Sequence, residues 1–141
     1  MLTDDDHSDI LRALGFHGLD TSHDVVSGAD STRGGIVDID RHIPAFSPNL
    51  LTASGARVPL RLDLALHELA EARGMREGMS YAKAHEKRGI PAERALANAL
   101  GIPYRAEQEE IAGYLSHVEH ERATNAPRGA LHVDPRAAIK R

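Results

Sequence analysis

The spacing of apolar positions along the chain changes near Pro59. Before this residue, short β-branched runs such as Val37 and Ile39 alternate with Asp38 and Asp40, and this two-residue period is typical of a half-buried strand. After it, apolar residues recur every three or four positions, as they do on the faces of amphipathic helices. The pattern predicts an α+β fold, in which a short N-terminal β-hairpin or sheet is followed by a helical bundle of about four helices.

The same pattern predicts one domain and a tail. The domain covers residues 1–122, with the sheet in residues 20–58 and the helical part in residues 59–122. A short helix capped by Ser8 is expected before the sheet. Residues 123–141 contain too few apolar side chains for a core element and end with basic residues, so we expect a tail or arm there that a partner orders.

Glycine and proline mark the expected ends of the helices. A first helix should begin at Pro59 and stop at Gly74, and Ser80 is placed to cap a second. The tripeptide Gly-Ile-Pro occurs twice, at 89–91 and at 101–103. At both places we predict a left-handed glycine just past one helix and a proline that starts the next.

Composition excludes several classes of function. The chain has 17 basic and 21 acidic residues, a formal charge of -4 and no basic stripe, so a nucleic-acid partner is not expected. It contains no cysteine, and a metal site would have to use His, Asp or Glu. The acidic N-terminus does not resemble a signal peptide, and no apolar run approaches the roughly 20 residues of a membrane span. We therefore expect a cytoplasmic protein with no membrane partner.

The stretch "LALHELAEARGM", residues 64–75, carries the strongest candidate chemistry. His67, Glu68 and Glu71 share one sector of the predicted helix, where the two glutamates repel each other unless a cation lies between them. A histidine four residues from a second ligand is the spacing that chelates zinc, with the adjacent glutamate placed as general base. His85 on the next helix is the best third ligand, and the set His67, Glu71 and His85 then predicts a site for zinc or another divalent metal with one open position.

A resemblance to known proteins follows from these residues. "HELAE" looks like the H-E-x-x-H/E helix of zincin-type metallohydrolases, and "DIDRHIP" followed by "LALHELAEARGMREGMSYAKAH" resembles small uncharacterised phage and prophage proteins. The similarity covers about residues 36–100. It implies a zincin-like, phage-associated, metal-dependent hydrolase of amide or peptide bonds, with His67 as ligand, Glu68 as base and the strand "GIVDID" as the edge that holds an extended peptide. Glu71 departs from the usual second histidine, and its charge weakens a metal as a Lewis acid.

Several residues allow two interpretations. Tyr81 can donate a hydrogen bond to a developing oxyanion, or it can be a core residue with its hydroxyl at the rim. His67 and Glu71 can be a simple hydrogen-bonded pair beside a solvated Glu68. Asp38 and Asp40 are expected on the solvent face of their strand, with His42 beside them reaching the cleft as a minority alternative. At the level of the whole chain, the rival hypotheses are a non-catalytic, phage-associated protein-binding module that uses a zincin-like scaffold and the C-terminal tail, and a metal-free helical domain.

Overall fold

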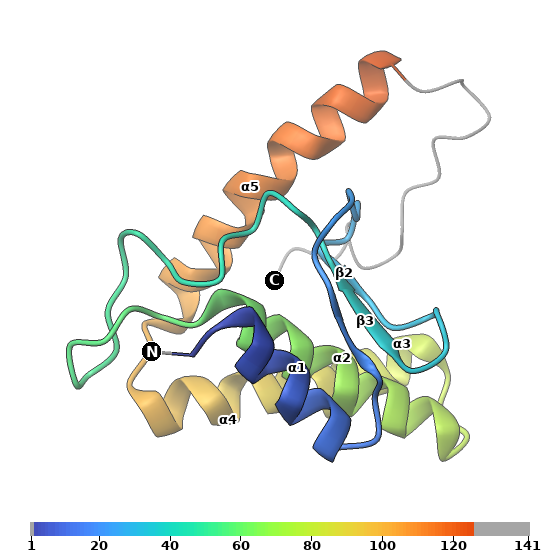
Figure 1. Cartoon of the computed structure of the whole chain (residues 1–141). Helices are drawn as coiled ribbons and strands as arrows, with labels where there is room; N and C mark the ends of the chain where they lie inside the picture. Colours follow the sequence, from blue (N-terminus) through green and yellow to red (C-terminus); the bar gives the residue numbers. More distant parts are fainter. Residues whose placement is uncertain (1, 126–141) are drawn as a thin grey trace.

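A computed structural model describes residues 2–125, and within them the side chains of residues 2–116. A small three-stranded sheet lies near the N-terminus and helices follow it, which confirms the predicted α+β class (Figure 1). The elements in chain order are α1 (Asp4–Ala13), β1 (Gly18–Asp20), β2 (Ala29–Asp30), β3 (Ile36–Ile39), α2 (Leu60–Arg76), α3 (Tyr81–Ala84), the π-helical turn η1 (His85–Gly89), α4 (Ile90–Leu100) and α5 (Tyr104–Asn125).

Strand β3 is the central strand of the sheet. It pairs in parallel with β1 and antiparallel with β2, so the strand order is β1-β3-β2. The antiparallel pair β2 and β3 forms a hairpin, with its first strand at Ala29–Asp30 and not in the β-branched residues Val25 and Val26 that precede it. The expectation that the "GIVDID" strand is an open edge for a peptide is wrong, because both sides of β3 already carry a neighbouring strand. Between the sheet and α2, Leu51 and Arg57 form one isolated antiparallel bridge.

Helix α2 is the element that other parts of the fold surround. It packs against β2 and β3, against α1, and against α3, η1 and α4. Its buried apolar residues, Leu60, Leu64, Ala65 and Leu69, belong to the main core. Because neighbours cover α2 on several sides, its polar residues are buried together with its apolar ones. This arrangement places the "HELAE" segment inside the protein.

The ends of α1 and α2 differ from the prediction in detail. Thr3, and not Ser8, caps α1: its hydroxyl accepts from the Asp6 N–H at 3.1 Å, and the Asp6 carboxylate accepts from the Thr3 N–H at 2.7 Å. Three aspartates in the first turn add favourable charge at the helix N-terminus. Helix α2 continues through Gly74 to Arg76, because Gly74 is buried against Ala84 and Met79 and serves close packing there.

The two Gly-Ile-Pro segments have different structures. Gly101 ends α4 in the left-handed conformation with φ 65°, as predicted. Gly89 has φ −64° and lies within continuous helix, so the stop predicted there is wrong. The Ile90 N–H donates to the carbonyl of His85, five residues earlier, and forms a π-turn. Pro91 has no N–H and its ring crowds the carbonyl four residues before it; the wider turn lets the helix continue through this proline.

Helix α5 runs to Asn125, past the predicted end at Arg122, and its far half projects beyond the other helices (Figure 1). Glu110 anchors its near half by accepting a hydrogen bond from Ser47 at 2.9 Å. Residues 123–125 of the expected tail are therefore helical, and residues 126–141 lie outside the described part of the chain. None of the helices in residues 2–125 combines the length and apolarity needed to cross a membrane.

Candidate metal centre

Three ligand-type atoms from two segments converge inside the protein. His67 Nε2 lies 2.5 Å from Glu71 Oε2 and 3.1 Å from His85 Nδ1, and His85 Nδ1 lies 2.7 Å from the same Glu71 oxygen. Helix α2 supplies His67 and Glu71 from successive turns, and η1 supplies His85. All three residues are at most 2% exposed. The structure thus brings together the three residues selected from the sequence as metal ligands and places them to bind a metal.

Two simple arrangements of protons leave a repulsive contact in this triangle of atoms. If both ring nitrogens carry a proton toward Glu71, two N–H groups face each other across the 3.1 Å edge. If only one carries a proton, the other ring nitrogen meets the carboxylate oxygen with lone pairs on both sides. A cation bound by all three atoms would remove the repulsion, because it would accept a lone pair from each. Two imidazoles and one carboxylate also form a donor set that zinc uses with one further position open. The residues present therefore fit a divalent metal.

The charge of the surrounding interior also favours a cation. Five carboxylates in the helices are at most 2% exposed: Asp63, Glu68, Glu71, Glu93 and Glu107. Among the described residues, the buried set includes no lysine or arginine. Buried carboxylates are costly unless a counter-charge or a proton accompanies them. A divalent ion held by His67, Glu71 and His85 would add positive charge to this carboxylate-rich interior.

Glu68 is buried beside the three ligands. Its exposure is 0%, and its Oε2 lies 4.0 Å from His67 Nε2. The alternative in which Glu68 is a solvated residue of an ordinary polar helix face is therefore wrong. If the three ligands hold a metal, Glu68 would be the carboxylate placed beside it to accept a proton.

Glu93 is a member of the site that the sequence analysis missed. Its Oε1 contacts Nδ1 of His67, the ring nitrogen that points away from the triangle. Its other oxygen accepts hydrogen bonds from Tyr104 Oη at 3.2 Å and from Gln108 Nε2 at 3.1 Å. No local feature of the sequence indicates this role, because a glutamate two residues after Pro91 is an ordinary first-turn residue of a helix.

Gly89, in the π-helical turn η1, lets the His67 ring pack directly against the helix backbone. A Cβ atom built on Gly89 would lie 2.6 Å from His67 Nε2 and 2.7 Å from its Cε1. Only a residue without a side chain lets the His67 ring lie this close to the helix backbone. The glycine is needed here for close approach and not for an unusual φ, since its backbone is right-handed helical.

Tyr81 lies against His85 from one turn earlier in the same helical segment. The two rings are stacked with centroids 6.0 Å apart and planes inclined by 17°. The Tyr81 residue is half-buried, and its hydroxyl oxygen lies inside the protein. His85 Nε2 is buried without a hydrogen-bond partner. Tyr81 therefore holds the plane of a candidate ligand; a role toward substrate stays a prediction.

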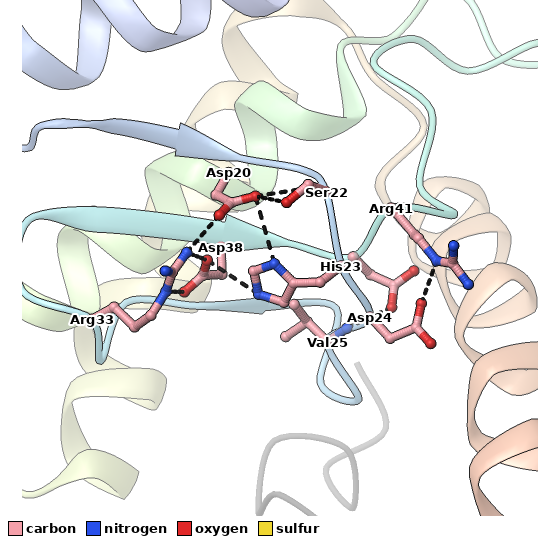
Figure 2. Close-up of polar contacts among 9 residues, drawn as sticks. Asp20, Ser22, His23, Asp24, Val25, Arg33, Asp38 and Arg41 are labelled. Atoms are coloured by element: carbon pink, nitrogen blue, oxygen red, sulfur yellow. Dashed lines mark hydrogen bonds and ion pairs between the residues drawn. The ribbon is translucent and has the colours of Figure 1, made fainter. Parts of the chain in front are cut away.

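A second group of ionisable residues lies at the sheet and differs from the first. Arg33 donates to Asp38 Oδ2 at 3.0 Å and to Asp20 Oδ2 at 2.6 Å, and His23 Nε2 lies 3.3 Å from Asp38 (Figure 2). Hydrogen bonds from Ser22, followed by that from Arg33, hold the pKa of Asp20 well below its ordinary value. An arginine already supplies the positive charge between these aspartates, so the group is an ion-pair cluster that joins β1 to β3.

The neighbouring residues correct two further expectations. Asp38 is 4% exposed and Asp40 is fully buried, so neither forms a solvent face. Asp40 Oδ2 accepts the Val25 N–H at 2.7 Å, and its Oδ1 accepts the N–H of His42 at 2.8 Å. His42 Nδ1 lies 3.0 Å from Asp40 and 3.5 Å from Asp24. Asp40 and His42 therefore fix the loops at the end of β3. The contacts of His42 are with Asp40 and Asp24 and not with the metal site, so the alternative in which it reaches the cleft is wrong.

Comparisons with protein-family models, with curated proteins and with solved structures gave no significant match for this chain.

Proposed function

We propose that this chain is a zinc-dependent hydrolase of amide or peptide bonds, with His67, Glu71 and His85 as ligands and Glu68 as general base. The observation that carries the proposal is the convergence of His67 Nε2, Glu71 Oε2 and His85 Nδ1, with the Glu68 carboxylate buried beside them. The two imidazoles and one carboxylate favour zinc over magnesium or calcium, which prefer oxygen ligands.

In the proposed reaction the chain contributes proton transfer and orientation. His67, Glu71 and His85 would hold the divalent ion, which would supply Lewis-acid chemistry for a substrate carbonyl and a water molecule. Glu68 takes a proton from the attacking water as the C–O bond forms, and passes it to the amide nitrogen as the C–N bond breaks. Tyr81 donates a hydrogen bond to the carbonyl oxygen while negative charge develops on it.

The test of this function separates metal binding from chemistry. Glu68→Gln should retain stoichiometric zinc and lose at least about 100-fold in the cleavage rate of a quenched-fluorescent peptide library, since general base catalysis supplies roughly that factor. Glu86→Gln is the matched control, because Glu86 is exposed and follows the ligand His85 directly. Equal cleavage by wild type and Glu68→Gln would reject Glu68 as the base.

One observation favours a second candidate function. The ligands and Glu68 are at most 2% exposed, which suits a metal that holds a scaffold together in a non-catalytic protein-binding module. A cobalt-substituted protein distinguishes the two functions. A hydroxamate should change its visible spectrum if a coordination position is open, and should leave it unchanged if the site is closed. Both candidate functions include an association with phages or prophages and action in the host cytoplasm or the virion. This part of the proposal rests on the sequence resemblance.

A further inference from the structure

Glu93 connects the metal centre to the start of α5. It lies in the first turn of α4, is 0% exposed, and contacts the outward ring nitrogen of His67. Its second oxygen accepts from Tyr104 and Gln108, which lie one turn apart on α5. This chain of polar contacts runs from α5 through Glu93 to His67 and ends at the atoms of the metal triangle.

We infer that Glu93 is a positioning residue that fixes which nitrogen of His67 binds the metal. The inference rests on the proposed metal site. A neutral imidazole has one N–H and one lone pair, and a carboxylate at Nδ1 holds the proton on that side. The lone pair is then on Nε2, the atom that faces Glu71 and His85. The negative charge behind the ring also makes Nε2 a stronger electron donor to the metal.

The α5 residues hold Glu93 in the required orientation. Tyr104 and Gln108 both donate to Oε2, which leaves Oε1 directed at His67. Arg94 of α4 lies over the Tyr104 ring, with its guanidinium carbon 4.7 Å from the ring centroid, and so restricts the tyrosine from the other side. The first two turns of α5 are therefore part of the metal centre although they supply no ligand.

This arrangement predicts that the two histidine ligands bind the metal through different ring nitrogens. His67 presents Nε2 to the triangle, whereas His85 presents Nδ1. In the zinc-loaded protein, long-range proton–nitrogen NMR spectra should show a protonated Nδ1 on His67 and a protonated Nε2 on His85. A site in which both histidines bind through the same nitrogen would contradict the assignment.

The variants that test the inference are Glu93→Gln and Tyr104→Phe. Glu93→Gln removes the charge with little change of shape and should weaken zinc binding by roughly 10- to 100-fold, the usual effect of losing a partner behind a metal ligand. Tyr104→Phe removes one hydroxyl and should weaken binding by a smaller factor in the same direction. Tyr114→Phe is the control on the same helix, because the Tyr114 hydroxyl lies 3.4 Å from Glu110, outside this network.

The measurements are zinc affinity by competition with a chromogenic chelator, the NMR spectrum, and the thermal unfolding of each metal-free protein. Unchanged affinity and an unchanged His67 signature in both Glu93→Gln and Tyr104→Phe would overturn the role of Glu93 while leaving the metal site intact. A wild type that binds no zinc would overturn the site and the inference together. If Glu93→Gln does not fold, Tyr104→Phe against Tyr114→Phe decides the question.

Discussion

Replacing Gly89 with alanine should damage the metal centre while improving the local helix. Gly89 lies in right-handed helical conformation at φ −64°, where alanine is favoured over glycine by about 0.5–1 kcal/mol. The added methyl carbon, however, would lie 2.6 Å from His67 Nε2. The helix propensity and the packing of the site therefore predict opposite results for one substitution.

The distances decide which effect dominates. To reach ordinary contact with the new methyl group, the His67 ring must retreat from 2.6 Å to about 3.4 Å. Metal–ligand bond lengths are defined to about 0.2 Å, so a displacement several times larger removes His67 from the ligand set or forces the helices apart. Inserting a methyl group into a packed interior costs about 1–3 kcal/mol, which exceeds the gain in helix propensity. We expect zinc affinity to fall roughly 100-fold or more, since loss of a ligand exceeds loss of a partner behind it.

The assay compares Gly89→Ala with Gly113→Ala. Gly113 lies in α5, and a Cβ atom there would meet nothing within 4 Å. Gly113→Ala should keep wild-type zinc affinity, measured by chelator competition, and gain about 0.5–1 kcal/mol in urea unfolding. If Gly89→Ala binds zinc as tightly as Gly113→Ala does, the contact between Gly89 and His67 is not a constraint on the site and the reasoning is refuted.

Two further predictions concern residues outside the metal centre. His7 is fully buried, and neither of its ring nitrogens has a hydrogen-bond partner. Burial lowers the pKa of His7 below the ordinary 6.5; the charges of Asp4 and Asp6 raise this pKa, and the charge of Arg61 lowers it further. As the pH falls below 6.5, His7 therefore takes up a proton more readily in the unfolded chain than in the folded one. Its contribution to stability is complete above that pH and is lost on acidification. Between pH 7.5 and 5.5 the urea midpoint of His7→Phe should change less than that of wild type, and equal changes would contradict this. Arg33→Gln should lower the urea midpoint, more at low salt than at high salt, and should leave zinc affinity unchanged. A loss of zinc would show that the ion-pair cluster at the sheet and the metal centre are coupled.

Hydrophobic spacing was enough to predict the class of fold and the position of the central helix. The sector containing His67 and Glu71 could be read from a period of 3.6 residues, and His85 from its place on the next helix. Local signals also identified Ser80 as a cap and Gly101 as a helix stop. Each of these features depends on residues within a few positions of one another, so sequence spacing describes them well.

The features that sequence missed depend on contacts between distant segments. Gly89 followed by Ile-Pro has the local signature of a helix stop, and only the position of His67 on another helix explains why a glycine is used there. Glu93 has the local signature of a first-turn acidic residue, and its role depends on His67 and on α5. Asp38 and Asp40 alternate with apolar residues as solvent-facing positions do, but Arg33 and the N–H of Val25 satisfy them in the interior.

The most direct test of the central claim is elemental analysis of tag-free protein at known concentration. Wild type, His67→Ala and His85→Ala are compared. His23→Ala is the control, because the His23 side chain is 45% exposed and belongs to the ion-pair cluster at the sheet. We expect nearly one zinc per chain in wild type and in His23→Ala, and loss of that zinc in both ligand variants. Folded wild-type protein without bound metal, even after incubation with zinc, would contradict the central claim.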